Sequence, residues 1–369
     1  MILTLSQLRL IQFKNYLSGE LELDPGINVL VGQNGAGKTN VLDAVHFLCL
    51  SKSYFSVPDS QVPLHGTQQF RVDGRFSRKE EREHIILKFQ AGKKKILERN
   101  KVPYTKLADH IGEFPVVVIA PDDNKLALEG SEVRRRFLDN TLSQMDRIYL
   151  NHLIVYNRLL NQRNALLKQF AKTQTYNEAM IQTYDEKMGP PAMYIHTKRK
   201  ALCAELHETF AHFYAQLSGA AEVMTFHYKS PLEEREWLNI QQSNREKDRI
   251  LQRTTSGIHR DNLEFQLADR PLKRFASQGQ LKSFIIALKL AQFRQLARQL
   301  EIIPILLLDD LFDKLDASRV HRLIEILSQA DFGQVFITDT EPDRMEAVLR
   351  QTSKSNKMFL IEAGTVHEV

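Results

Sequence analysis

Short stretches in which apolar and polar residues alternate lie near the start of the chain, at Leu8–Phe13 and Leu21–Leu23, with turn-forming residues between them. A continuous apolar run at Ile27–Val31 is typical of a buried strand. After a glycine-rich segment, the apolar residues of Val41–Leu48 recur at helical spacing. The pattern therefore predicts two strands joined by a turn, followed by a strand, a loop and a helix.

Most of the segment from Phe70 to Val118 also has the pattern of strands. Runs rich in β-forming residues at Arg71–Phe76, His84–Phe89 and Phe114–Val118 accompany a predicted turn at Asn100-Lys101. These runs predict a second, antiparallel sheet region.

The character of the chain changes after Pro121-Asp122. From about Leu126 to Leu217 the pattern is almost wholly helical, with a predicted interruption at Gly189-Pro190-Pro191. A heptad-like apolar stripe follows the early part of this segment, and Arg163 occupies one of its expected apolar places. The stripe consists of Tyr149, Leu153, Tyr156, Leu160, Leu167 and Phe170. It favours a helix packed in a bundle over a free coiled coil.

The last part of the chain mixes strands and helices. Its predicted elements are strands at Glu222–Tyr228, Asn262–Leu267, Ile302–Leu308 and Gln334–Thr338, and helices at Gln280–Leu300 and Ser318–Leu327. A strand, a crossover helix and a second strand imply a parallel sheet. The fold class is therefore α/β, with mixed parallel and antiparallel sheets and a mainly helical second lobe. Residues 1–125 and 300–369 are expected to form the first lobe, and residues 126–299 the second.

Composition narrows the class of protein. The chain has 43% hydrophobic and 26% charged residues, which is ordinary for a protein that folds in water. No run reaches the roughly 20 apolar residues that cross a bilayer, and the N-terminus has no secretion signal, so a cytoplasmic location is expected. Cys49 and Cys203 lack metal-binding spacing and are expected to be buried, reduced thiols. A net charge of +5 permits nucleic acid as a partner without proving it.

The glycine-rich segment matches the phosphate-binding pattern G-x-x-x-x-G-K-[ST], known as Walker A. Its residues are Gly32, Gln33, Asn34, Gly35, Ala36, Gly37, Lys38 and Thr39. The glycines let consecutive backbone amides surround phosphates at the start of a helix. Lys38 is expected to reach the β- and γ-phosphates of ATP, and the Thr39 hydroxyl to bind Mg²⁺. A chance glycine-rich turn is the alternative, and the strand and helix on either side argue against it.

A buried apolar run that ends in two acids has the form of a Walker B strand. Leu306–Leu308 lead into Asp309, which is expected to hold Mg²⁺, and into Asp310, which is placed where a general base could polarise the attacking water. A strand that ends in a solvated acidic turn is the alternative. The Walker A segment upstream makes the catalytic interpretation the stronger one.

A third candidate segment opens the predicted helix near Gln280. A serine, a glycine and a helix N-terminus together can bind an anion, with the Ser277 hydroxyl and the Gly279 amide as donors and Gln280 beside them. A plain helix cap at Ser277 would use the same residues. The place of this segment, after Walker A and just before Walker B, is the place of the signature motif of ABC-type ATPases.

Taken together, these motifs resemble the heads of the SMC-related group of ABC-type ATPases. Within that group the chain is similar to the RecF family of bacterial recombination mediators over essentially its whole length. The resemblance rests on Gly32–Asn40, Pro121-Asp122 with Gly130 and Arg134–Asp139, Gly257–Asp261, Ser277–Lys282 and Leu308–Asp316.

The resemblance implies a two-lobed, ABC-type P-loop ATPase head that binds ATP and Mg²⁺ and hydrolyses ATP slowly. The Ser277–Gln280 segment of one copy would close over ATP held by a second copy, so that a homodimer forms when both bind ATP. The dimer would clamp double-stranded DNA near single-strand junctions and, with RecR and RecO, help to load recombinase at gaps. Hydrolysis would then release the DNA.

The chain departs from the family pattern in several places. Ser131 stands where the family usually has proline, and Asp313-Lys314 replaces the usual residues before Leu315-Asp316, which bears on contacts across the dimer. Asp310 stands where many ABC ATPases carry glutamate, and the shorter acid is consistent with slow hydrolysis. No switch histidine is evident at Ile337–Thr340, after the last core strand, so the γ-phosphate sensor is not assigned.

Clusters of basic residues are the candidate DNA contacts. The predicted contacts are Lys93, Lys94, Lys95, Arg134, Arg135, Lys198, Arg199 and Lys200, and a further spread of cations lies at Arg245, Lys247, Arg249 and Arg253. Lysine and arginine bind backbone phosphates without reading sequence, and such binding weakens with salt. A solvated charged face is the alternative for each cluster, and Arg134-Arg135 could instead brace the lobe interface or a phosphate. His259 and Arg260 are open between a packed hairpin and a functional site.

Three other classes of protein are alternatives to this interpretation. A transporter ATPase subunit would carry a Leu-Ser-Gly-Gly-Gln signature and a Walker B glutamate, and this chain has neither. Another SMC-like repair ATPase with a long coiled-coil arm would need more helix between the motifs, at about 1.5 Å per residue. An ATP-gated DNA-binding module with negligible hydrolysis remains open, because Asp310 replaces the glutamate.

Overall fold

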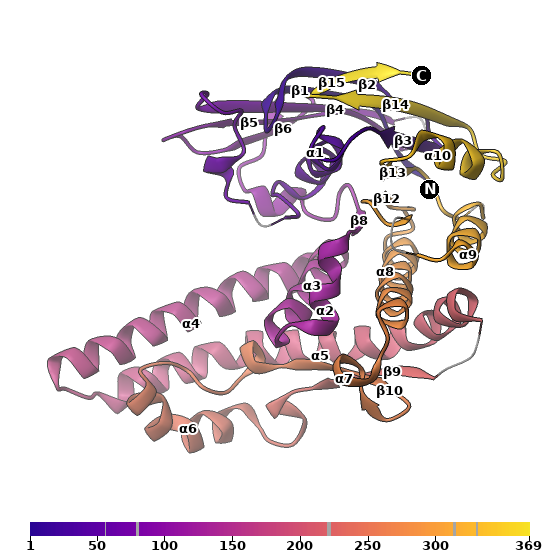
Figure 1. Ribbon diagram of the computed structural model, residues 1–369. Coiled ribbons are helices and arrows are strands. Elements are labelled where there is room, and N and C mark those ends of the chain that lie inside the picture. Colours follow the sequence, from indigo (N-terminus) through magenta and orange to yellow (C-terminus); the bar gives the residue numbers. More distant parts are fainter. Residues whose placement is uncertain (56, 79–80, 220–222, 313–314, 330) are drawn as a thin grey trace. The chain divides into compact units, whose positions relative to one another are not determined.

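The computed structural model describes residues 1–55, 57–78, 81–219, 223–312, 315–329 and 331–369 (Figure 1). The chain divides into two units, each built from segments that are separate in the sequence. The first unit comprises Met1–Asp123, Phe213–Ala220 and Lys282–Val369, and the second comprises Asn124–His212 and Ala221–Leu281. Among the described residues, no helix is long and apolar enough to cross a membrane.

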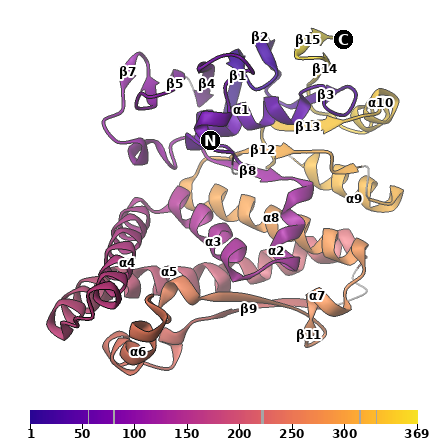
Figure 2. The same cartoon turned by 60° about the vertical axis from the view of Figure 1, so that its left-hand side comes forward.

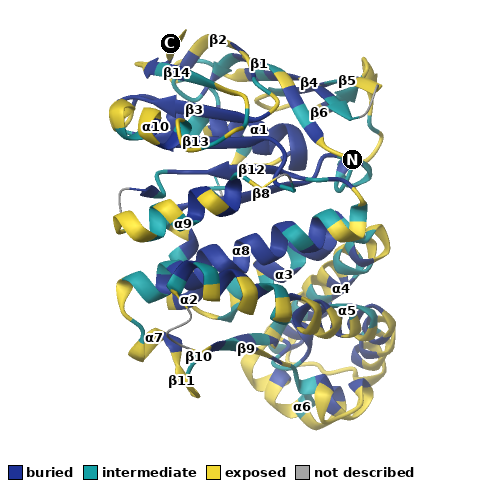
Figure 3. Cartoon of the chain, turned by 90° about the vertical axis from the view of Figure 1, so that its right-hand side faces the viewer, coloured by how far each residue is buried: buried dark blue, intermediate teal, exposed yellow. Residues whose placement is uncertain are grey.

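A mostly parallel sheet in the first unit carries the glycine-rich loop and the acidic pair at its strand ends. Its order is β15-β14-β3-β13-β12-β8, so β12 lies between β13 and β8 (Figure 2). The strands are β3 (Ile27–Val31), β8 (Val116–Ile119), β12 (Ile305–Leu308), β13 (Val335–Asp339), β14 (Asn356–Glu362) and β15 (Thr365–Glu368). Every residue of β3, β8, β12 and β13 is buried, as expected for strands covered on both faces (Figure 3).

The predicted parallel pairing of the two C-terminal strands is confirmed, since Leu306 of β12 pairs with Val335 of β13 in parallel. The strand predicted at Phe114–Val118 is present as β8, but its predicted antiparallel setting is wrong. β8 pairs in parallel with β12 and sets Ile119 beside Leu308. A short apolar run does not reveal its neighbours, because strand pairing depends on segments far away in the chain.

The second sheet of the first unit is antiparallel, with the order β2-β1-β4-β5-β6-β7. Its strands are β1 (Leu3–Phe13), β2 (Tyr16–Glu22), β4 (Gln69–Arg78), β5 (Glu81–Gln90), β6 (Ile96–Arg99) and β7 (Val102–Pro103). The predicted turn at Asn100-Lys101 is confirmed, with φ values of 52° and 69° at the two residues. Both values are positive, as a tight hairpin turn requires.

Helix α1 (Lys38–Leu50) packs between the two sheets, with contacts to β4 and β5 of one and β13 of the other. All but two of its residues are buried, so it has no polar face. The ring of Phe47 lies 5.7 Å from the rings of Phe13 and Phe70, with edge-to-face geometry. The start of α1 is therefore held firmly at the end of β3, where the glycine-rich loop lies.

Among the described residues, the first unit also holds the C-terminal end of α5 (Glu178–Ser218), most of α8 (Gln278–Leu300), and α9 (Ala317–Leu327) and α10 (Pro342–Leu349). The sequence placed the second lobe boundary at 299, whereas α8 from Lys282 onward belongs to the first unit. A cluster of aromatic rings explains the difference. The Phe332 ring stacks on Phe293 of α8 at 4.8 Å and lies 6.3 Å from Phe213.

The second unit is mainly helical. Its elements are α2 (Lys125–Leu128), α3 (Ser131–Met145), α4 (Arg147–Thr173), most of α5 (Glu178–Ser218), α6 (Trp237–Leu251), α7 (Leu272–Phe275), and the strands β9 (Met224–Lys229), β10 (Asn262–Leu267) and β11 (Arg270–Pro271). Short 3-10 turns in the two units lie at Asp59–Gln61, Leu107–His110, Pro121–Asn124, Pro231–Glu233 and Ile258–Arg260. The three strands form a small antiparallel sheet of order β11-β10-β9.

The predicted interruption at Gly189-Pro190-Pro191 is wrong, because α5 is continuous through both prolines. Proline removes a backbone donor and strains the preceding turn. Here Trp237 of α6 supports that turn, since its indole Nε1 donates to the main-chain oxygen of Asp185 at 2.6 Å. A Cβ at position 189 would lie 3.0 Å from the same indole ring, so the glycine lets α6 approach closely.

The apolar stripe of α4 faces the interior, as a bundle helix requires. Arg163, which occupies an apolar place in that stripe, is completely buried. Its Nε donates to Asp185 Oδ1 at 2.8 Å, and its Nη1 donates to Asp248 Oδ2 at 2.7 Å. Both cysteines are buried and free, as predicted.

Candidate nucleotide-binding site

The loop between β3 and α1 is shaped by glycines with positive φ, at 149° for Gly32, 80° for Gly35 and 123° for Gly37. The β1–β2 hairpin braces this loop: Asn15 Nδ2 donates to the oxygen of Ala36 at 2.8 Å, and the Tyr16 hydroxyl donates to the oxygen of Gly37 at 3.1 Å. A Cβ at Gly37 would lie 2.6 Å from Asn15 Nδ2. Glycine is therefore required at position 37 by both backbone angle and space.

Lys38 begins α1, and only 4% of its surface is exposed. Its Nζ donates to the main-chain oxygens of Gly32 at 2.8 Å and Gln33 at 3.1 Å. Phosphate oxygens in the loop would be charged, stronger acceptors for the same ammonium group. The first turn of α1 has no acidic residue and no side-chain cap, so its N–H groups and dipole also favour an anion.

Thr39 lies directly against the Walker B acid. Its Oγ1 donates to Asp309 Oδ1 at 2.8 Å, although 270 positions separate the two residues in the chain. The two strands that precede them are parallel members of one sheet and end at the same edge. A hydroxyl and a carboxylate oxygen are hard ligands of the kind that Mg²⁺ prefers, with substrate phosphates and water completing an octahedron. Thr39 and Asp309 therefore fit the predicted metal site.

Thr338, at the end of β13, joins both Walker B acids. Its Oγ1 donates to Asp309 Oδ1 at 2.9 Å and accepts from the backbone N–H of Asp310 at 2.8 Å. Asp310 has a φ of 40°, a conformation that a residue other than glycine seldom adopts, and Thr338 holds the peptide in it. The sequence drew attention to Ile337–Thr340 without assigning a role. The contact depends on the order of β3, β13 and β12 in the sheet, which local patterns do not reveal.

The electrostatics of the acidic pair follow from burial. Burial raises the pKa of Asp309, and the Asp310 carboxylate raises it further. Hydrogen bonds from Thr39 and Thr338 and the charge of Lys38 act in the opposite direction. A divalent cation at Asp309 would stabilise the ionised carboxylate, so the site is suited to bind metal and phosphate together.

The signature segment forms a reciprocal helix cap at the start of α8. The Ser277 N–H donates to Gln280 Oε1 at 2.5 Å, and the Gln280 N–H donates to Ser277 Oγ at 3.3 Å. This is the capping alternative that the sequence left open. The Ser277 hydroxyl keeps its own proton for another acceptor. Ser277, Gly279 and Gln280 belong to the second unit, whereas the structure brings Lys38, Thr39, Asp309 and Asp310 together in the first.

Several predicted DNA contacts are engaged within the protein. Lys95 pairs with Asp59 at 2.6 Å, Lys198 with Asp146 at 3.0 Å and Lys200 with Glu233 at 3.4 Å. Lys93 and Lys94 are exposed between β5 and β6, and neither has an ion-pair partner in the described part of the chain. Lys93 and Lys94 are thus the members of their cluster that are free to meet a phosphate.

Arg199 is a correction to the predicted DNA contacts. Only 2% of its surface is exposed, and its guanidinium donates to Asp139, Asp261 and the oxygen of Ile258. A buried and fully paired cation cannot contact DNA without unfolding this cluster, so Arg199 has a structural role. The sequence does not indicate that Arg199 is buried while Lys198 and Lys200 are not. The three residues are consecutive, and only their directions around the helix axis differ.

Arg134 and Arg135 are half-buried, and each braces the second unit with part of its guanidinium. Arg134 Nε donates to Asn262 Oδ1 at 3.0 Å, and Arg135 Nη1 donates to the oxygen of Asp261 at 2.7 Å. These bonds lie within the second unit, so the predicted bracing of the lobe interface or of a phosphate stays a prediction. The departure at Asp313-Lys314 lies outside the described residues.

The fold and the site define a P-loop ATPase head of the ABC type, with Walker A and Walker B at one edge of a parallel sheet. Comparisons with known proteins agree. The family model "RecF/RecN/SMC N terminal domain" matches residues 4–365. The DNA replication and repair protein RecF of Flavobacterium johnsoniae is 43% identical over 96% of this chain and 99% of that protein. RecF of Porphyromonas gingivalis is 40% identical over 99% of this chain and 100% of that protein. The chain belongs to the RecF family.

Solved structures show the same relationship. A structure of the recombination mediator RecF with ATP, from the RecFOR pathway, covers 100% of this chain and 98% of its own, with a TM-score of 0.89 and 25% identity. The Smc head domain of Pyrococcus furiosus covers 100% of this chain and 96% of its own, with a TM-score of 0.59 and 15% identity. The similarity to the Smc head domain shows a shared fold and nothing more.

Proposed function

We propose that this chain is an ATP-gated DNA clamp of DNA repair. Two copies join on double-stranded DNA near single-strand gaps when both bind ATP, and slow hydrolysis separates them. The observation that carries the proposal is the connected set of Thr39, Asp309, Thr338 and Asp310, which ties the phosphate-binding loop to two strand ends. In such a set, the presence of a γ-phosphate and its cation can alter several hydrogen bonds at once.

The proposed gate needs a second copy, because in ABC-type heads the signature segment of one copy closes over ATP held by another. In the proposed dimer, the Ser277 hydroxyl and the amides at the start of α8 contact the γ-phosphate of ATP held by the partner. ATP then binds the joined state more tightly than the separate chains, and this difference in affinity drives association. Asp310 positions the water for hydrolysis, with Lys38 and a magnesium ion neutralising the phosphate charge.

The partners follow from the family. One structural relative is described as a recombination mediator of the RecFOR pathway, and the curated relatives are DNA replication and repair proteins. We therefore propose RecR and RecO as partners and recombinase loading at gaps as the outcome. Lys93 and Lys94 offer exposed cations for the sugar-phosphate backbone.

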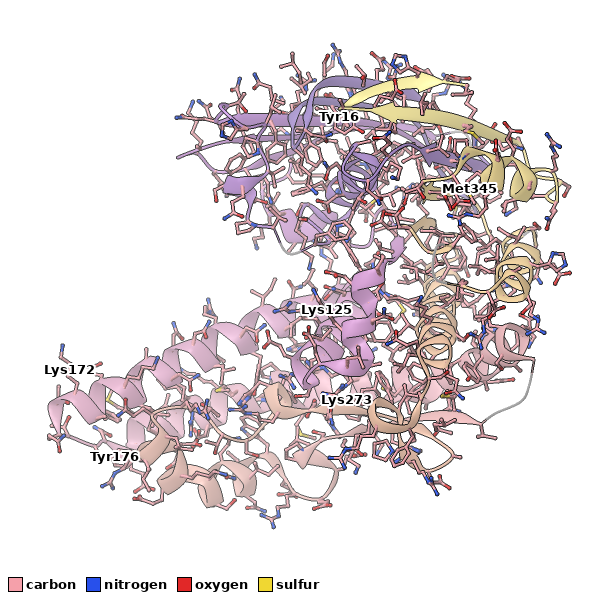
Figure 4. The ribbon with its side chains drawn as sticks, in the orientation of Figure 1. Tyr16, Lys125, Lys172, Tyr176, Lys273 and Met345 are labelled. Carbon is pink, nitrogen blue, oxygen red and sulfur yellow. The ribbon has the colours of Figure 1, made fainter. Side chains whose placement is uncertain are left out.

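The test is the binding of a gapped DNA duplex with and without ATP, measured by fluorescence anisotropy. Wild-type protein is expected to bind more tightly with ATP, and Lys38→Ala to lose the difference because the loop no longer holds phosphates. Lys172→Ala is the matched control, since Lys172 lies exposed near the end of α4 and far along the chain from the loop (Figure 4). Equal DNA binding with and without ATP in the wild type would contradict the gate.

A second candidate, an ATP-gated module with negligible hydrolysis, is favoured by the unusual backbone angle of Asp310. The two candidates differ in turnover. In the first, Asp310→Asn lowers the ATPase rate by about 100-fold or more and prolongs the DNA-bound state. In the second, wild type and Asp310→Asn release DNA at the same rate.

A further inference from the structure

The segment between α6 and β10, residues 253–261, is a largely buried loop that makes many hydrogen bonds with the rest of the second unit. The N–H and Oγ1 of Thr254 both donate to Asn164 Oδ1, at 2.7 and 2.8 Å. The N–H and Oγ1 of Thr255 both donate to Asp248 Oδ1, at 2.8 and 2.6 Å. We call residues 253–261 the tethered loop.

The guanidinium groups of two buried arginines donate hydrogen bonds to the tethered loop. Arg163 Nη1 donates to Thr254 Oγ1 at 2.9 Å, and Arg199 Nη1 donates to Ile258 O at 2.8 Å and Asp261 Oδ2 at 2.7 Å. Removing ions from water costs several kcal/mol each unless pairing compensates. A loop that only connects two elements does not need buried cations. Their presence here indicates that the conformation of the tethered loop is important for function.

Gly257 and His259 also restrict the conformation of the tethered loop. Gly257 has a φ of 134°, and a Cβ there would lie 2.9 Å from the Tyr156 hydroxyl and 3.1 Å from the ring of Trp237. His259 Nε2 lies 3.1 Å from the oxygen of Thr254, so Nε2 carries the proton and Nδ1 accepts from the Tyr156 hydroxyl at 2.8 Å. Burial lowers the pKa of His259 to about 4, and the charges of Arg260, Arg135 and Arg163 contribute to the shift. Positive charge therefore gathers around a neutral histidine.

Two of the guanidinium groups at this loop have no carboxylate partner. Arg260 is exposed, and its side chain makes no hydrogen bond or ion pair with any part of the chain that the structure describes. Arg135 reaches the same loop through the oxygen of Asp261, and its other hydrogen bond goes to Ser131 Oγ at 2.7 Å. The nearby carboxylates of Asp139, Asp185, Asp248 and Asp261 are bonded to Arg163 or Arg199 instead. Two cations thus meet the same loop with spare donors, Arg260 as part of the loop and Arg135 through its bond to Asp261.

We propose that Arg135 and Arg260 form a binding site for a DNA backbone phosphate, held in place by the tethered loop. Guanidinium groups match the geometry of phosphate oxygens and donate to two of them at once. Contacts of this kind position a protein on DNA without reading its sequence, as a clamp requires. The inference rests on the proposed function, because that function supplies DNA as the polyanion. It adds Arg260 to the DNA-binding residues and gives the loop Gly257–Asp261 a role.

The test is the salt dependence of the affinity for a gapped duplex, with ATP present. Each phosphate contact contributes about 0.9 to the slope of log affinity against log salt concentration. Arg260→Gln is expected to lower the slope by about that amount, for any DNA sequence. Arg260→Lys keeps the charge, so it should retain the slope while losing affinity several-fold. Arg158→Gln is the matched control, because Arg158 is an exposed, unpaired arginine of α4 among the described residues.

The outcomes separate this inference from the proposed function. If wild-type protein shows no ATP-dependent DNA binding, the proposed function fails before the variants are compared. If the wild type binds and Arg260→Gln keeps the wild-type slope and affinity, the phosphate site is refuted. If Arg260→Gln weakens ATP-dependent self-association without DNA, Arg260 contacts a second copy instead, which also overturns the proposal.

Discussion

At the scale of single residues, one hydroxyl group connects the two acids that the proposed hydrolysis uses. Thr338 bonds to Asp309 through its proton and to the backbone of Asp310 through its oxygen. The sequence identified Lys38, Thr39, Asp309 and Asp310, because each belongs to a motif with characteristic spacing. It did not identify Thr338, Asn15 or Tyr16, because these reach the site through sheet order and a hairpin that brings distant residues together.

Thr338→Val is expected to lower turnover by about 10-fold or more with little change in ATP affinity. Valine has the same shape but leaves the N–H of Asp310 without its acceptor and frees a residue held at an unusual φ. Thr338→Ser should recover most of the rate, since it restores the hydroxyl. ATPase kinetics and binding of a fluorescent nucleotide measure the two quantities. Wild-type turnover in Thr338→Val would show that the hydroxyl does not position Asp310.

At the scale of elements, hydrophobic spacing predicted most strands and helices of the structure. The predicted strand, loop and helix around Gly32–Thr39 are confirmed. Here the spacing of apolar residues, the glycines and the flanking residues all indicate the same elements. The errors arise where distant partners decide the outcome. β8 joins the parallel sheet because β12 lies beside it, and α5 continues through two prolines where Trp237 of α6 bonds to the turn before them.

The buried arginine of α4 gives a test at this scale. Arg163→Leu is expected to destabilise the second unit by about 3–5 kcal/mol, because Asp185 and Asp248 lose their common partner in the interior. Trp237 is the single tryptophan of the chain and contacts this cluster, so its fluorescence during urea unfolding reports on the right region. Arg158→Leu, one turn earlier and exposed, should change stability by less than about 0.5 kcal/mol. Similar midpoints for the two variants would refute a structural role for the buried pair.

At the scale of the whole molecule, neither unit is a continuous stretch of sequence. The sequence predicts the first lobe boundary at 125, close to the division after Asp123 in the structure. It predicts the second boundary at 299, whereas the structure divides the units after Leu281. Helix periodicity gives no sign of this second division, because α8 is one uninterrupted helix across it. Tertiary contacts assign its C-terminal part to the first unit, including the packing of Phe293 on Phe332 and the ion pair of Lys289 with Asp123.

Buried histidines predict how stability depends on pH. Burial lowers the pKa values of His46, His110 and His259 to about 4, from 6.5. Unfolded chains then bind more protons, so stability is complete above about pH 6.5 and falls as pH decreases toward 4, by up to about 3 kcal/mol per histidine. Thermal unfolding monitored by circular dichroism between pH 7.5 and 4.5 measures this loss.

His110 offers a specific variant for the same measurement. Its Nε2 lies 2.6 Å from the oxygen of Leu48, and its buried Nδ1 has no partner among the described atoms, so a second proton would have no acceptor. His110→Gln can still donate to Leu48 but does not titrate, so it should lose less stability than the wild type on acidification. The exposed His65→Gln is the control. An unchanged pH profile in His110→Gln would show that His110 does not contribute.

The central claim is that a complete ATP site needs two copies of the chain, one supplying Lys38 and the other Ser277. Lys38→Ala and Ser277→Arg can be mixed in equal amounts with ATP and magnesium, and their mass followed by light scattering. Each variant alone should remain monomeric, whereas the mixture should form dimers, because a mixed pair contains one site with both residues intact. Dimers of either variant alone, or a mixture that stays monomeric while the wild type dimerises, would contradict the composite site.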